Sequence, residues 1–201
     1  MRYDNLFPTL IQITDDILAD DKRQIMINDI FGKRIGSPHK NWQSEPNLNE
    51  QPIYSKLVDK IATHTAQYLE EMKYKYEGFK ITGMWANVLD ENEFHRPHNH
   101  SNNMLSGVYY VKSSKRHPGI VFQDPRTQVD ILVPEIREFN KTNSSIWSYD
   151  CIEDRMIIFP AWLKHYVPVN ETTNEERVSI SWNIMFDGKL GCSEDLSLAR
   201  F

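Results

Sequence analysis

From Phe79 to Phe186 the chain alternates short runs rich in isoleucine, valine, tyrosine, phenylalanine and tryptophan with clusters of turn-forming residues. This pattern is typical of antiparallel β-structure, because β-branched and aromatic side chains favour strands and turn residues separate them. The expected strands are Phe79–Leu89, Glu93–His100, Met104–Lys112, Gly119–Phe122, Ser144–Ser148, Arg155–Pro160, His165–Val169 and Arg177–Phe186. Strands in this number and at this spacing predict a double-sheet jelly roll, also called a double-stranded β-helix.

The residues before Phe79 carry a helical pattern. One helix is expected around Asp16–Phe31 and a second over Gln51–Tyr76. Apolar residues of the second helix recur at spacings that keep them on one face; they are Ile53, Leu57, Ile61, Tyr68 and Met72. This helix should therefore cover a sheet, and His64 beside its apolar face is expected to be a buried or half-buried structural histidine.

The length of 201 residues predicts a single jelly-roll domain over the whole chain. Residues 1–78 are expected to form a helical N-terminal support, with a turn-rich loop at Gly36–Pro46 between the helices. Residues 79–187 form the predicted β core, and residues 188–201 a peripheral tail.

The composition is that of an ordinary globular protein, with 40% hydrophobic and 25% charged residues. A formal net charge of −5 and a pI near 5.8 argue against a nucleic-acid partner. The sequence has neither a membrane-length apolar stretch nor the apolar core of a signal peptide, so we expect a cytoplasmic protein without a membrane partner. Cys151 and Cys192 are too few for a disulfide framework, and both are expected to be free thiols.

Histidines are concentrated in one short polar segment, which contains His95, His98 and His100. Alternate side chains of an extended strand share a face, so His98 and His100 can approach one ion. His165 follows the apolar run Met156–Pro160, which indicates a buried strand, and can supply a third ligand. His95 is the competing ligand. Imidazole suits zinc, copper, iron and nickel, and a site with three protein ligands and open positions is typical of catalytic metals.

Polar and apolar residues alternate at the start of the strand Arg177–Phe186. Arg177, Ser179 and Ser181 share one face, and the opposite face is apolar. Arginine binds carboxylates through paired hydrogen bonds, and a hydroxyl two positions along the same face can add another. This face therefore suggests an anionic co-substrate. The alternative is that Arg177 faces solvent and pairs with one of the two glutamates before it.

Taken together, these blocks resemble a family of 2-oxoglutarate and iron(II)-dependent oxygenases found in bacteria and phages. The matching blocks are His98-x-His100, Leu105–Val111, Phe122–Arg126, Phe159–His165 and Glu176–Asn183. The resemblance covers about Phe79 to Phe186, and Leu6-Phe7-Pro8 matches the usual beginning of the family. The combination is specific, although each block alone is not.

The resemblance implies a jelly-roll enzyme in which His98, His100 and His165 hold Fe(II). It also implies that 2-oxoglutarate chelates the metal, that its far carboxylate meets Arg177 and Ser179, and that oxygen takes the remaining position. Oxidative decarboxylation of 2-oxoglutarate to succinate and carbon dioxide would then drive hydroxylation of an unactivated C–H bond. Ascorbate is a candidate accessory reductant.

Alternation along the inner strands suggests further residues of the pocket wall. Tyr109 and Asn87 are expected there as cofactor-binding residues. Trp85 is a weaker candidate, for which core packing is the safer prediction. The segment Asp124–Arg126 is expected to form a turn salt bridge or, from the resemblance, a clamp on an acidic substrate.

The sequence departs from the broader superfamily at His100, because the usual triad is two histidines and one carboxylate. This departure leaves open a different metal, or a carboxylate supplied by Asp90, Glu93 or Asp124. Two alternatives to the oxygenase therefore remain: a cupin-like three-histidine metalloenzyme that does not use 2-oxoglutarate, and a non-enzymatic jelly-roll binding module.

The substrate stays open at this stage, and both a small molecule and a protein side chain are compatible with the pattern. The polar segment Asp124–Asn143 is expected to be a lid or a substrate loop. Exposed helix surface could support a homodimer, although no heptad pattern of coiled-coil length is present.

Overall fold

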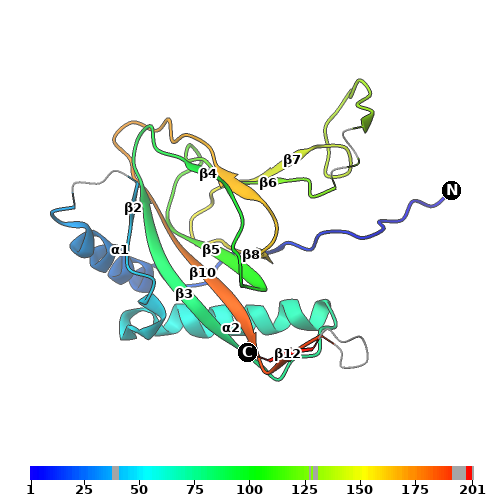
Figure 1. The fold of residues 1–201 in the computed structure, drawn as a ribbon. Coiled ribbons are helices and arrows are strands. Elements are labelled where there is room, and N and C mark those ends of the chain that lie inside the picture. The colour runs from blue at the N-terminus through cyan, green and yellow to red at the C-terminus, as the bar shows by residue number, and fades with distance from the viewer. Residues whose placement is uncertain (38–40, 127, 129–130, 192–197, 201) are drawn as a thin grey trace.

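The computed structural model describes residues 1–37, 41–126, 128, 131–191 and 198–200. Its centre is a sandwich of two antiparallel sheets, which confirms the predicted jelly roll (Figure 1). In spatial order, the larger sheet contains β1 (Gln12–Thr14), β8 (Met156–Pro160), β5 (Leu105–Lys112), β10 (Arg177–Asp187), β3 (Gly78–Leu89) and β2 (Trp42–Gln43). The smaller sheet contains β4 (His95–His98), β9 (His165–Val167), β6 (Ile120–Gln123) and β7 (Ile146–Tyr149). A separate hairpin contains β11 (Lys189–Leu190) and β12 (Ala199–Arg200).

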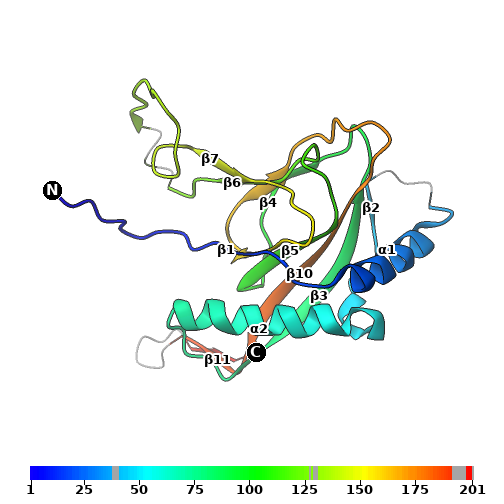
Figure 2. The same cartoon turned by 180° about the vertical axis from the view of Figure 1, so that it is seen from behind.

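Two helices cover the outer face of the larger sheet, the face turned away from the smaller sheet (Figure 2). They are α1 (Asp20–Arg34) and α2 (Ser55–Glu71), and the short 3-10 helices η1 (Leu48–Glu50) and η2 (Pro52–Tyr54) precede α2. The apolar face of α2 buries Leu57 and Ile61 in this core, because residues four apart lie on one side of a helix. His64 is half-buried, as predicted, and its Nδ1 lies 2.9 Å from Gln67 Oε1.

Side chains of the larger sheet alternate between the helix-covered face and the interior of the sandwich. On β10, Ile180 and Trp182 belong to the core shared with the helices. Ser179 points the other way and is paired in register with Asn87 of β3. The alternation predicted for the start of β10 is therefore confirmed, and it turns a row of polar side chains toward the space between the sheets.

Every strand expected between Phe79 and Phe186 is present, with its ends shifted by a few residues. The segment expected as Glu93–His100 is a strand only over β4, so His100 lies in the following loop. α2 is shorter than expected at both ends, whereas α1 is displaced along the chain: it begins at Asp20 and continues beyond Phe31 to Arg34. Asp16 has a left-handed φ of 58°, which keeps it out of α1, and Lys73 takes a φ of 55° just after α2 ends.

Several short strands were not indicated by the sequence pattern. β1 and β2 lie within residues 1–78, so the N-terminal support is not purely helical, and β2 falls in the loop expected at Gly36–Pro46. The tail contributes β11 and β12. Strands of two or three residues are too short for an alternating pattern to reveal them. The described residues of the segment 124–143 form no strand.

No helix in the described part of the chain is long and apolar enough to cross a membrane. Cys151 is a buried free thiol, as predicted. Cys192 lies outside the described residues.

Gly119 is required where β6 begins. A Cβ atom at this position would lie 1.9 Å from the carbonyl oxygen of Tyr149, so Gly119→Ala must push β6 and β7 apart. We expect the substitution to lower the free energy of unfolding by about 1 to 3 kcal/mol in urea denaturation. Gly32→Ala on α1 is the matched control, because no atom of the described residues lies within 4 Å of a Cβ there. It should stabilise the protein by up to about 1 kcal/mol. Equal effects of the two substitutions would contradict this account.

Asp15 ties the N-terminal segment to the residue before β8. Its carboxylate accepts hydrogen bonds from Arg155 Nε at 2.7 Å and Nη2 at 2.9 Å, which lower the pKa of Asp15. We expect Asp15→Asn to lower the free energy of unfolding by about 0.5 kcal/mol at pH 7. Because the folded-state pKa is depressed, this contribution is present above the unfolded-state pKa of about 4 and is lost as the pH falls below it. Wild type and variant should therefore converge in acid denaturation, and a constant difference down to low pH would refute the assignment.

Candidate metal centre

Three histidine side chains meet between the two sheets. His98 ends β4, and His165 begins β9 directly opposite it in the antiparallel register. His100 follows in the next loop, where its backbone N–H donates to the carbonyl oxygen of Ala161 at 2.9 Å. One nitrogen from each ring lies within 4.8 Å of the others. This is the arrangement that a metal ion bound by all three rings requires.

Backbone carbonyl groups orient two of these rings. Nδ1 of His98 lies 2.7 Å from the carbonyl oxygen of Arg96, and Nδ1 of His165 lies 2.9 Å from that of Leu163. A carbonyl can only accept, so each Nδ1 carries the hydrogen and each Nε2 keeps its lone pair for a metal. Burial is the main cause that lowers the pKa of His165 to about 3 and that of His100 to about 4. Both rings are therefore neutral at pH 7.

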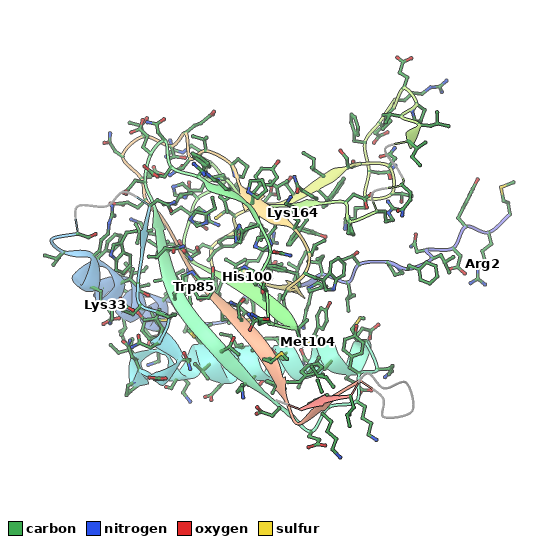
Figure 3. The ribbon with its side chains drawn as sticks, viewed as in Figure 1. Arg2, Lys33, Trp85, His100, Met104 and Lys164 are labelled. Atoms are coloured by element: carbon green, nitrogen blue, oxygen red, sulfur yellow. The ribbon has the colours of Figure 1, made fainter. Side chains whose placement is uncertain are left out.

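The histidines line a cavity of about 490 Å³ between the sheets. Strands of both sheets contribute to its wall, which includes Asn41, Gln43, Trp85, Asn87, Glu93, His95, Arg177, Ser179 and Ser181. Figure 3 shows Trp85 close to His100, and the centres of their rings are 6.0 Å apart. Core packing was the safer prediction for Trp85, and it is wrong: the half-buried indole is part of the cavity wall.

Two aromatic rings pack against His165. The ring centre of Phe159 lies 4.7 Å from that of His165, and the ring centre of Phe122 lies 6.0 Å from it. Both phenylalanines belong to the apolar cluster that fills this part of the sandwich. Phe159 also lines the cavity, so His165 lies where the cavity meets the apolar core.

Arg177 is a buried cation that has no carboxylate partner in the described part of the chain. The residue is 1% exposed. Its Nη1 donates to Ser179 Oγ at 3.1 Å, and its guanidinium carbon lies 4.9 Å from the centre of the Tyr110 ring. Its Nε has no acceptor among the described residues. Within the described part of the chain, these contacts bring no carboxylate to the positive charge.

The two glutamates before Arg177 are engaged elsewhere. Glu175 pairs with Arg116, and Glu176 Oε2 lies 3.3 Å from Lys112 Nζ. The alternative of a surface ion pair for Arg177 is therefore wrong. A buried charge without a partner is costly. Since Arg177 lines the cavity, an anion bound there can offset that cost.

Tyr110, and not Tyr109, is the tyrosine beside Arg177. Tyr109 belongs to the core shared with the helices and donates its hydroxyl to Asp154 Oδ1 at 2.6 Å, so its expected place in the pocket wall is wrong. Among the described residues, the buried Tyr110 hydroxyl has no hydrogen-bond partner, and burial raises the pKa of Tyr110 to about 12. Sequence alone could not separate the two, because nearly all of β5 is buried on both faces.

Asn87 lines the cavity, where strand alternation places it. Gln43 Nε2 donates to Asn87 Oδ1 at 2.8 Å, and Asn87 Nδ2 donates to Ser181 Oγ at 3.1 Å. This chain of polar side chains crosses three strands of the larger sheet. Gln43 was missed in the sequence, because the two residues of β2 show no periodicity.

Among the described residues, no carboxylate joins the three histidines. Of the acidic residues considered as ligands, Asp90 pairs with Arg34, and Asp124 accepts a hydrogen bond from Arg126 Nη2 at 2.7 Å. Asp124 and Arg126 thus form the expected turn salt bridge. Glu93 lines the cavity but lies outside the cluster of possible metal ligands.

A family model described as "Putative 2OG-Fe(II) oxygenase", where 2OG is 2-oxoglutarate, matches residues 83–183. The chain belongs to this oxygenase family. The match includes the three histidines and Arg177, so it confirms the resemblance seen in the sequence. Fe(II) is the metal of the oxygenase and 2-oxoglutarate its cosubstrate, and three imidazoles form a donor set that suits iron. No curated protein sequence matches the chain.

Solved structures share the fold of this oxygenase at low sequence identity. HygX from Streptomyces hygroscopicus, with nickel and 2-oxoglutarate bound, is 7% identical with a TM-score of 0.63, over 88% of this chain and 82% of that one. A Pseudomonas putida prolyl-4-hydroxylase is 11% identical with a TM-score of 0.63, over 90% and 94%. The α-ketoglutarate-dependent epimerase SnoN from nogalamycin biosynthesis is 12% identical with a TM-score of 0.63, over 88% and 78%. Identities this low establish a common fold only.

The uncompensated charge of Arg177 predicts an unusual effect on stability. We expect Arg177→Met to raise the free energy of unfolding of the ligand-free oxygenase by about 1 to 3 kcal/mol, because an apolar side chain of similar length replaces a buried charge. Arg155→Met is the matched control and should lower it by about 0.5 kcal/mol, because Arg155 is paired with Asp15. Urea denaturation measures both. A destabilised Arg177→Met variant would mean that the protein itself compensates the charge.

Proposed function

We propose that this oxygenase is a hydroxylase that uses Fe(II) and 2-oxoglutarate to oxidise a C–H bond of its substrate. One observation carries the proposal. A buried arginine, Arg177, which has no carboxylate partner in the described part of the chain, lines the same cavity as the three-histidine cluster. In the overall reaction, substrate, dioxygen and 2-oxoglutarate give hydroxylated substrate, succinate and carbon dioxide. One oxygen atom enters the substrate and the other enters succinate.

The three histidines would hold the iron, which when bound supplies the site where 2-oxoglutarate and dioxygen react. The carbonyl groups of Arg96 and Leu163 keep His98 and His165 in the orientation that offers Nε2 to a metal. All three ligands are neutral, so they leave the charge of the metal uncompensated. The two carboxylates of 2-oxoglutarate supply the missing negative charge.

Arg177 and Ser179 would bind the carboxylate of 2-oxoglutarate that does not reach the metal. Hydrogen bonds from a charged donor in a buried site are stronger than neutral ones. The hydroxyl of Ser179 already lies 3.1 Å from Arg177 Nη1 and holds the guanidinium in place. Tyr110 packs against the guanidinium and restricts its movement. This preorganisation lowers the entropic cost of binding the anion.

The described histidine cluster lacks a carboxylate, which is the one feature in favour of a second candidate, a three-histidine metalloenzyme that does not use 2-oxoglutarate. The family match counts against this candidate, and so does the buried charge of Arg177, which such an enzyme would not need. Within the oxygenase family, a hydroxylase differs from an epimerase in its product, since only hydroxylation raises the substrate mass by one oxygen atom. The mass of the product therefore tests the reaction type.

Anaerobic titration of the Fe(II)-loaded protein with 2-oxoglutarate should produce a visible metal-to-ligand charge-transfer band. His165→Ala should abolish the band, because it removes a metal ligand. Arg177→Ala should weaken 2-oxoglutarate binding about 10-fold or more, because it removes a charge-assisted hydrogen bond. His64→Ala and Arg116→Ala are the matched controls outside the cavity and should titrate like the wild type.

The other outcomes of this titration separate the alternatives. Bound iron without a band in the wild type would support the three-histidine enzyme that does not use 2-oxoglutarate. A protein that binds no metal would support a non-enzymatic jelly-roll module. A band that Arg177→Ala leaves unchanged would remove Arg177 from the cosubstrate site.

A further inference from the structure

A fourth histidine, His95, lines the cavity without belonging to the metal cluster. It begins β4, where it is paired in register with Val167 of β9. Its ring nitrogens lie outside the group of possible ligands formed by the other three histidines. The geometry therefore gives no support to His95 as the competing metal ligand, and the ring is left with another role in the same cavity.

Hydrogen bonds around His95 determine which of its ring nitrogens carries the hydrogen. Asn41 Nδ2 donates to the backbone carbonyl oxygen of Phe94 at 3.2 Å. A carbonyl can only accept, so this bond fixes the orientation of the Asn41 amide. Asn41 Oδ1 then lies 2.8 Å from His95 Nε2 and must accept a hydrogen from it. The neutral ring therefore has its hydrogen on Nε2 and a bare lone pair on Nδ1.

The bare nitrogen of His95 has no hydrogen-bond partner in the described part of the chain. Burial, followed by the positive charge of Arg177, lowers the pKa of His95 to about 4, so the ring is neutral at pH 7. Asn41 has a φ of 50°, a left-handed conformation that asparagine adopts more readily than most residues. The residue type at position 41 thus suits both the backbone and the hydrogen bond to His95.

We propose that His95 is a substrate-binding residue whose Nδ1 accepts a hydrogen bond from a hydroxyl or N–H group of the substrate, and that Asn41 positions it. This inference rests on the proposed function and narrows the substrate class. The substrate carries such a donor near the C–H bond that is oxidised, and a pure hydrocarbon does not qualify. A bare lone pair also repels carboxylate oxygens, so His95 disfavours misplaced 2-oxoglutarate while Arg177 attracts it.

The first part of the test measures the tautomer directly. Long-range ¹H–¹⁵N NMR spectra of full-length protein labelled with ¹⁵N-histidine show which ring nitrogen carries the hydrogen. In the wild type, His95 should have its hydrogen on Nε2. Asn41→Gly should release this preference, because glycine tolerates the backbone but offers no acceptor. Asn41→Asp keeps an acceptor and should restore it. A hydrogen on Nδ1 of wild-type His95 would overturn the proposal.

The second part uses a matched pair of probes on the same labelled protein. N-methylacetamide has an N–H donor, and N,N-dimethylacetamide has the same amide without it. N-methylacetamide should shift the His95 Nδ1 resonance saturably, and N,N-dimethylacetamide should not. The resonances of His64, which does not line the cavity, serve as the internal control and should stay unchanged with both probes.

Each remaining outcome decides the question. Equal responses to both probes would mean that small amides enter the cavity but that His95 does not distinguish the one with an N–H donor. No response to either probe would show that Nδ1 is not an accessible acceptor. Both results would overturn the proposal. The measurements need neither iron nor 2-oxoglutarate, so their failure is distinct from a missing charge-transfer band. Repeating them with Zn(II) in place of iron should leave the His95 tautomer unchanged.

Discussion

The positive charge of Arg177, buried between two sheets, is the constraint around which the interior of this protein is arranged. β10 pairs with β3 on one side and with β5 on the other, so the backbone that carries Arg177 cannot shift to expose it. Ser179 accepts a hydrogen bond from the guanidinium and the Tyr110 ring packs against it, but neither side chain carries a negative charge. Such a buried charge lowers the free energy of unfolding of the ligand-free protein, but it also provides a preorganised binding site for an anion.

The histidine cluster would add to the positive charge of the cavity when it binds a metal. Imidazole is a neutral ligand, so a divalent metal held by three of these rings would place further positive charge in a cavity that already contains Arg177. A dianion with two separated carboxylates is the complement of two separated cationic centres. Asn41, Gln43 and Asn87 add neutral hydrogen-bonding groups to a wall that also contains Glu93 and Arg96. The cavity therefore offers both charged and neutral polar groups to the molecules that bind in it.

Much of this architecture follows from patterns that are visible in the sequence. The change from helical to alternating periodicity predicts the jelly roll, and the alternation at the start of β10 places Arg177 on the polar face. Other features leave no such signal. β5 is buried on both faces, so its pattern could not choose between Tyr109 and Tyr110. The contribution of Asn41 depends on hydrogen bonds to residues far along the chain, which no local pattern encodes.

The cross-strand pairing of His98 with His165 links metal binding to the folding of the whole chain. In the unfolded chain, His98 and His100 remain neighbours, but closing the long loop to His165 costs conformational entropy. The complete donor set therefore exists only after β4 and β9 have paired. An ion that binds the folded chain much better than the unfolded one shifts the folding equilibrium by mass action. The concentration of available metal therefore affects the folded fraction of the protein as well as the active fraction.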